Sequence, residues 1–351
     1  MTDSGQFPTR KLGIGGALAL KADGTEPRAG AVNQHIEGRA DGTRVMLDTE
    51  VASLLHDPFA VLVLRRGVFP LTAKAVLDEL DKHNGEPAGV PDSASFMVFE
   101  GSQIPVTADG DRGGARLVVV RGRGNAPELM VSCLLGPKDS TTTPGVLVEV
   151  LSWDPDNRTL HFYQLQSGQW FWCGQSDMSA DADTRGRGPF DSHVNGYPLM
   201  KELKTPWVHW HGPDMQISPE AFAADDPLRD DPLFTARRSA YEFEDRVREL
   251  IDRWNTARFD KMTAGAQLTH GQIVAEQILA SPAANLTSTN VPWVSAEGAQ
   301  LTLPTTFFFD EECLVSVLQI PVDPVTLQMV GARYKALAEK HDLRVRNRDT
   351  S

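Results

Sequence analysis

The chain has 351 residues, of which 41% are hydrophobic and 23% charged, and its formal net charge of −13 gives a pI near 5.1. This acidic balance argues against nucleic acid as a partner, because binding to a phosphate backbone requires clustered Lys and Arg. No apolar stretch approaches the roughly 20 residues needed to span a bilayer, and the three cysteines lie far apart without a CxxC motif, as expected in a reducing compartment. We therefore expect a cytoplasmic protein with no membrane partner.

The N-terminal part is predicted to begin with an irregular arm and to continue with one strand and one helix. Residues 1–44 are rich in Gly, Ala, Asp and Arg and show little periodicity. The β-branched apolar run FAVLVLRR (59–66) predicts a buried strand. Residues 71–85 predict a helix with Thr72 as its N-cap.

The next hundred residues alternate between strand-length apolar runs and turn sequences such as GDRGG, GPKDSTTTPG and DPDN. Runs of this length, separated by Gly, Pro, Asp and Asn, are typical of an antiparallel meander. The predicted strands are 95–99, 116–120, 128–135, 145–153, 159–165 and 169–173.

The second half of the chain is predicted to be mainly helical. In residues 237–258, apolar side chains recur at i, i+3, i+4 and i+7 and form one stripe. The last predicted helix, 323–343, has Asp323 as N-cap, Pro324 at its first position and Leu327 in its apolar stripe. Two further helices are predicted over 269–280 and 310–318, and a strand is predicted between them over 299–309.

Together these elements predict an α+β fold, in which an antiparallel β-sheet meander in the first half of the chain packs against helices from the second half. The length is compatible with either one large domain or two smaller domains that share an interface. We divide the chain into an irregular N-terminal arm, a sheet-rich subdomain, a loop segment rich in His and Trp, and a mainly helical subdomain. Their ranges are 1–44, 45–175, 176–215 and 216–351.

Histidine and tryptophan are concentrated in residues 189–212, PFDSHVNGYPLMKELKTPWVHWHG, which hold three of the nine histidines and two of the seven tryptophans. If this segment is extended near its end, His209 and His211 project from the same side with Cα atoms about 7 Å apart, since each residue advances about 3.3 Å. Two imidazoles at that spacing can reach one metal ion. We expect His193 as a third ligand and Asp191 as a carboxylate ligand, a set that suits iron or copper.

An aromatic pocket for a small apolar or aromatic substrate is predicted around this metal. Its walls would exclude water and consist of Trp170, Trp172, Trp207 and Trp210. Lys201 and Glu202 are the candidate catalytic residues, because their side chains could position polar groups of the substrate. The first predicted function is therefore a metal-dependent enzyme or redox protein, in the class of oxidoreductases.

Residues 189–193, PFDSH, resemble the C-x-x-C-H haem-attachment motif of c-type cytochromes, with proline and serine in the places of the two cysteines. The resemblance implies His193 as the proximal ligand of a haem and Met200 as its distal ligand. Because both attaching cysteines are missing, it implies noncovalent haem.

The same residues also permit a structural interpretation, which the sequence leaves open. Trp207 and Trp210 can be core side chains whose indole N–H groups bond to the backbone, with His209 and His211 as partners in a polar network. The second predicted function is then a non-catalytic protein with an aromatic groove for a peptide or a small molecule. The sequence does not choose between the two functions and does not give the oligomeric state.

Overall fold

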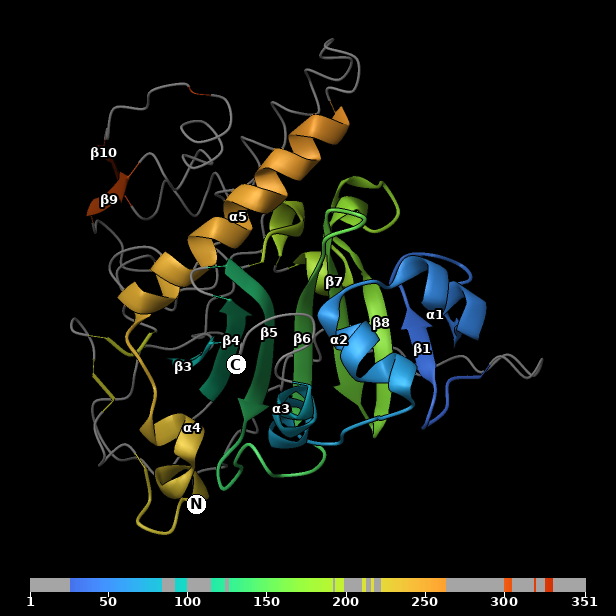
Figure 1. The fold of residues 1–351 in the computed structure, drawn as a ribbon. Helices are drawn as coiled ribbons and strands as arrows, with labels where there is room; N and C mark the ends of the chain where they lie inside the picture. Colours follow the sequence, from blue (N-terminus) through green and yellow to red (C-terminus); the bar gives the residue numbers. More distant parts are fainter. Residues whose placement is uncertain are drawn as a thin grey trace, which may run out of the picture.

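The computed structural model describes residues 26–83, 92–99, 115–123, 126–191, 193–198, 210–212, 216–217, 222–262, 300–304, 319 and 326–330. Within these residues, eight strands form one mixed sheet whose two faces are covered by helices (Figure 1). The predicted α+β class is confirmed. The prediction of a purely antiparallel sheet is wrong, because one pair of strands is parallel.

The sheet has the strand order β2-β1-β8-β7-β6-β5-β4-β3. From β3 to β8 each strand pairs antiparallel with the next, which confirms the predicted meander. The bounds are β1 Val32–His35, β2 Thr43–Val45, β3 Asp92–Phe99, β4 Ala115–Arg123, β5 Ala126–Leu135, β6 Leu147–Asp154, β7 Thr159–Gln166 and β8 Gln169–Gln175.

Strand β1 and the first two residues of β2 lie inside the range that was predicted to be irregular, so the prediction for residues 1–44 is wrong at these six positions. β1 pairs parallel with β8, and the buried side chain of Asn33 joins the two, because its Nδ2 donates to the Trp170 carbonyl oxygen at 3.1 Å. Strands of three and four residues are too short to show an alternating pattern in the sequence. Only the pairing with β8 makes them recognisable.

One face of the sheet is covered by the short helices α1, α2, α3 and α4. Residues Val148 and Val150 of β6 and Trp170 and Trp172 of β8 project into this core, as period-two alternation requires. Helices α1 to α3 come from the first half of the chain and α4 from the second, so the prediction that the sheet packs against helices of the second half is wrong for three of the four helices on this face. The bounds are α1 Asp48–Leu54, α2 Pro58–Leu62, α3 Ala73–Lys82 and α4 Pro232–Thr235.

The predicted strand over residues 59–66 is wrong, because this segment forms α2 and the 3-10 turn Leu64–Arg66. Asp57 caps α2 by accepting the backbone N–H groups of Phe59 and Ala60, and Pro58 occupies the first helical turn. A short apolar run does not distinguish a buried strand from a buried helix. Here the cap and the proline select the helix.

The opposite face is covered by α5, Ala240–Met262, the long orange helix of Figure 1. This confirms the helix predicted over 237–258, and its Val247, Leu250 and Trp254 are buried as the stripe indicates. Four 3-10 turns complete the helical elements described: Ser176–Ala180, Gly188–Asp191, Val194–Gly196 and Pro227–Asp230.

Near the C-terminus, β9 (Gln300–Pro304) and β10 (Thr326–Val330) form a separate antiparallel pair. β9 agrees with the strand predicted over 299–309. The helix predicted over 323–343 is wrong at residues 326–330, because Leu327 pairs with Leu303 in this ladder. The helices predicted over 269–280 and 310–318 lie outside the described residues.

Candidate functional site

The predicted His and Trp site is only partly covered by the described residues. His193, Trp210 and His211 are described, as are Trp170 and Trp172 in the sheet. For Asp191 the backbone is described but not the side chain. The remaining predicted site residues lie outside the described ranges: Met200, Lys201, Glu202, Trp207 and His209.

His193 and His211 lie against different strands. The His193 ring packs edge-on against Phe162 of β7, with ring centroids 5.1 Å apart, whereas the His211 N–H donates to the Met97 carbonyl oxygen of β3 at 3.0 Å. Four strand steps separate β7 from β3, which is about 19 Å at about 4.8 Å per step. Nδ1 of His211 accepts the backbone N–H of Ile217 at 3.3 Å. The structure therefore does not bring these two imidazoles together.

The described tryptophans do not wall one pocket either. Trp170 and Trp172 belong to the core under α2, whereas Trp210 belongs to the core under α5, on the opposite face of the sheet. Trp210 stacks on Phe243 with centroids 4.6 Å apart, and the Trp170 indole N–H donates to the Pro70 carbonyl oxygen at 2.8 Å. These three are core side chains, as the structural interpretation of the sequence expected for Trp210. The backbone hydrogen bond expected for the Trp210 indole N–H is not found, because this group has no partner within the described residues.

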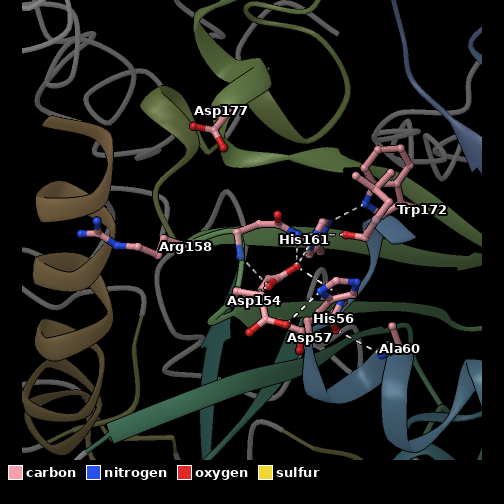
Figure 2. Close-up of polar contacts among 12 residues, drawn as sticks. His56, Asp57, Ala60, Asp154, Arg158, His161, Trp172 and Asp177 are labelled. Carbon is pink, nitrogen blue, oxygen red and sulfur yellow. Dashed lines mark hydrogen bonds and ion pairs between the residues drawn. The ribbon is translucent and has the colours of Figure 1, made fainter. Parts of the chain in front are cut away.

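A buried polar network lies under α2 and holds His161 between Asp154 and Trp172 (Figure 2). The Trp172 indole N–H donates to Nδ1 of His161 at 3.0 Å, and an indole can only donate. His161 therefore carries its proton on Nε2, which donates to Asp154 Oδ2 at 3.0 Å. Both ring nitrogens are used, and neither is left for a substrate or a metal.

Asp57 makes a second pair of contacts beside this network. One carboxylate oxygen caps α2, and the other accepts the hydroxyl of Tyr163 on β7 at 2.5 Å. Burial and the adjacent Asp57 raise the pKa of Tyr163 well above its usual value, so the phenol remains a hydrogen-bond donor. These contacts attach α2 to the sheet, and we assign the network under α2 a structural role.

His56, Asp154 and Asp156 form a group whose possible ligand atoms all lie within 4.8 Å of one another. Asp154 already accepts five N–H groups, from His161 Nε2, the backbone of His56 and Asp156, and both the backbone and side chain of Asn157. Burial acts to raise the pKa of Asp154, but these bonds outweigh it and lower the pKa far below the usual value. Because N–H groups occupy the carboxylate where a cation would bind, this group is a poor metal site.

A polar row crosses the opposite face of the sheet from β4 to β7, which we call the Glu149 cluster: Arg116, Ser132, Glu149, Gln164 and His193. The Arg116 guanidinium donates to both Ser132 Oγ and Glu149 Oε2. Gln164 Nε2 donates to Glu149 Oε1 at 3.1 Å. The register places Ser132, Glu149 and Gln164 directly opposite one another on adjacent strands.

His193 joins the Glu149 cluster from the turn that follows the 3-10 turn Gly188–Asp191. Its Nδ1 lies 2.8 Å from the Tyr197 carbonyl oxygen, and since a carbonyl only accepts, Nδ1 carries the proton. The turn between them needs the left-handed backbone of Asn195 and Gly196, and a Cβ on Gly196 would lie 2.5 Å from the Ser176 carbonyl oxygen. The Nε2 lone pair has no hydrogen-bond partner within the described residues.

The charges of the cluster act on His193. Burial lowers the pKa of His193 to about 4, Glu149 raises it and Arg116 lowers it, so both charged groups lie near the ring. Burial also acts to raise the pKa of Glu149, but Arg116, His193 and Gln164 outweigh it, and the net pKa is lowered. At neutral pH the cluster therefore holds a carboxylate, a guanidinium and a neutral imidazole.

No protein-family model, curated protein or solved structure matches the chain. The resemblance of residues 189–193 to a haem-attachment segment therefore stays an untested prediction. Among the helices of the described ranges, none combines the length and the apolar character that crossing a membrane requires.

Solvent reaches the sheet at the Glu149 cluster. The side chain of Glu149 is 30% exposed, although that of Arg116 is only 7% exposed and Gln164 is 6% exposed. Cys173 lies on the same face, where burial and then Glu149 raise the pKa of its thiol, so it is not a reactive nucleophile.

The sequence analysis identified His193 but missed its neighbours in the Glu149 cluster. The run GVLVEVLSW was interpreted only as a strand, and its one charged residue, Glu149, was not singled out. A carboxylate in the middle of an apolar strand was the available signal, because a buried charge requires a partner. The partner, Arg116, is 33 positions away and could not be inferred from sequence.

Proposed function

We propose that the protein binds a small polar molecule at the Glu149 cluster. The observation that supports this most directly is the unused Nε2 of His193, on a ring that Tyr197 and Phe162 hold in place. His193 is only partly buried, and its Nε2 is not one of the buried side-chain atoms that lack a partner. A positioned acceptor that the described residues leave unused, beside a carboxylate that solvent reaches, is where a ligand can take the place of water as the hydrogen-bond donor.

Binding is better supported than acid–base catalysis. A general base is most effective when its pKa lies near the working pH, whereas the pKa of His193 is lowered to about 4 by burial. The neutral imidazole is then a weak base at pH 7 but a permanent hydrogen-bond acceptor. This favours the second function predicted from the sequence, a small-ligand-binding protein, with its site at Glu149 instead of at a tryptophan groove.

The test is a screen of small polar fragments by ligand-observed NMR against the full chain at pH 7. We expect fragments that bind the wild-type protein to lose binding in H193N, because Asn keeps a donor for the Tyr197 carbonyl oxygen but removes the Nε2 acceptor. H56N is the matched control, since His56 lies on the other face of the sheet and contacts Asp156. Equal binding to wild type and H193N, or no binding fragment at all, would show that the proposal is wrong.

A metal-dependent enzyme, the first function predicted from the sequence, is our second candidate. The support for it is that Nε2 of His193 is a neutral nitrogen near the Glu149 carboxylate, and both groups are common metal ligands. The Arg116 guanidinium on the same carboxylate opposes a divalent cation. Elemental analysis of protein purified without a polyhistidine tag tests this candidate, and an H193N variant that retains the wild-type metal content would exclude His193 as a ligand.

A cytoplasmic location is likewise a proposal. It is supported by the sparse and separated cysteines, and the two described ones, Cys133 and Cys173, are free and buried. Cysteines that remain reduced are typical of a reducing compartment.

A further inference from the structure

We infer that the ligand of the Glu149 cluster is a small organic cation, a protonated primary amine attached to an apolar or aromatic group. This inference rests on the proposed function, because it names the chemical class of the molecule that binds there. It follows from which hydrogen-bonding groups of the cluster remain unused.

Three residues of the cluster carry unused acceptors, and the unused donors of Ser132 and Gln164 are the neutral hydroxyl and the second amide N–H. Nε2 of His193 has no partner within the described residues, and neither has Oε1 of Gln164, whose Nε2 must face Glu149 because a carboxylate only accepts. Each oxygen of Glu149 accepts one bond and has capacity for another. An ammonium group has three donors and no acceptor, so it can donate one hydrogen bond to an acceptor on each of these three residues.

The charge of the cluster also favours a cation over an anion. Arg116 is the only guanidinium or ammonium group for which the described residues show a contact with Glu149, and it already donates to this carboxylate and to Ser132. An anion would have to lie beside Glu149, whereas an ammonium would gain a charge-assisted bond to it. A monovalent cation also repels Arg116 less than a divalent metal ion does.

Aromatic rings beside the acceptors indicate the rest of the ligand. Phe162 precedes Gln164 by two residues on β7 and contacts the His193 ring. Phe171 is the direct cross-strand partner of Gln164. Phe171 lies in the core under α5, and Gln164 borders this core. An arylalkyl group can pack against such rings while the ammonium reaches Glu149, and the ring faces themselves attract a cation.

Isothermal titration of the full chain at pH 7 with benzylamine, benzyl alcohol and zinc chloride tests the inference. We expect benzylamine to bind about tenfold more tightly than benzyl alcohol, because a charge-assisted hydrogen bond is about twice as strong as a neutral one. In E149Q this preference should disappear. The matched control E244Q, which alters a carboxylate on α5 paired with Arg248, should keep it.

E149Q leaves the buried Arg116 without its counter-ion and can reduce folding, so H193N provides a second variant. It keeps the Glu149–Arg116 pair and removes one acceptor, and we expect it to weaken benzylamine about threefold to tenfold, the loss of one hydrogen bond. Its circular dichroism spectrum should match that of the wild type.

Each other outcome overturns the inference in a distinct way. If benzyl alcohol binds as tightly as benzylamine and both are weakened in H193N, the site exists but does not select a cation. If zinc binds with dependence on Glu149 and His193 while benzylamine does not, the metal candidate replaces the amine. If none of the three probes binds, the inference is overturned, and the fragment screen separately decides whether the site binds any ligand.

Discussion

At the scale of single residues, the structure separates two histidines that look alike in the sequence. His161 uses both ring nitrogens, one toward Asp154 and one toward Trp172, and is fully buried. His193 uses only Nδ1. A histidine whose nitrogens are both bonded to the protein stabilises the fold, whereas a positioned free nitrogen can bind a ligand. The sequence predicts His193 as a metal ligand together with His211, but the structure does not bring these two histidines together.

The partly buried, neutral His193 predicts a dependence of stability on pH. Its folded pKa of about 4 lies below the value of 6.5 expected in the unfolded chain, so below pH 6.5 the unfolded state takes up a proton that the folded state does not. The free energy of unfolding should therefore fall as the pH drops from 6.5 toward 4, by at most about 2 kcal/mol at pH 5 for this group.

Urea denaturation at pH 8, 6.5 and 5 measures this loss. H193N removes the titrating ring and should show a shallower decline than the wild type. Part of the decline should remain in H193N, because burial also lowers the pKa of His211 to about 4, with Arg237 lowering it further. A decline equal to that of the wild type would mean that His193 is protonated in the folded state.

At the scale of elements, local end signals proved more informative than apolar runs. Residues 59–66 looked like a strand because β-branched residues dominate, yet Asp57 and Pro58 are an N-cap and a first-turn proline, and they begin a helix. The same rule correctly located α3, whose N-cap is Thr72. The predicted C-terminal helix is an exception. It has the same cap and proline signals, yet part of it forms β10, because pairing with β9 decided the conformation there. Propensity is a weak signal where tertiary pairing competes with it.

The Asp57 cap is predicted to stabilise the protein more than an ordinary helix cap. Asp57→Ala removes the cap of α2 and also leaves the buried Tyr163 hydroxyl without its acceptor. We expect a loss of about 2–4 kcal/mol, the sum of about 1 for a cap and about 1–3 for an unpaired buried donor.

Urea denaturation at pH 7 measures the effect, with Thr72→Ala as the control. Thr72 only caps α3, through Ala75, and its removal should cost about 1 kcal/mol. Adding Tyr163→Phe to Asp57→Ala should recover part of the loss, because the unpaired hydroxyl is then absent. Equal losses for the two single variants would show that the Tyr163 contact contributes nothing.

At the scale of the whole molecule, β1 extends the sheet beyond β8, the last strand of the meander. β1 comes before all the strands of the meander in the sequence, yet it pairs with β8, the last of them. The edge of β8 is therefore covered by a strand that lies 134 or more residues earlier in the chain. An uncovered central strand presents unpaired N–H and C=O groups and promotes association between chains. β1 therefore protects the part of the sheet that carries Trp170 and Trp172.

We predict that a chain beginning at Asp48, which lacks β1 and β2, has a lower melting temperature and forms aggregates. A chain beginning at Glu26 keeps both strands and serves as the control. Thermal melts and light scattering at equal concentration distinguish the two. If the shorter chain remains monodisperse and melts at the same temperature as the control, the parallel pairing of β1 with β8 does not contribute to stability.

The sequence by itself determined the α+β class, the six strands of the meander, and helices α3 and α5, because hydrophobic periodicity and caps are local properties of the chain. The tertiary structure decided which strands extend the sheet beyond the meander, which helices cover each face, and which polar residues contact one another. Arg116, Glu149 and Gln164 lie on three different strands, and their contacts depend on strand register. Register is set by packing and turn geometry over the whole sheet, so no local pattern encodes it.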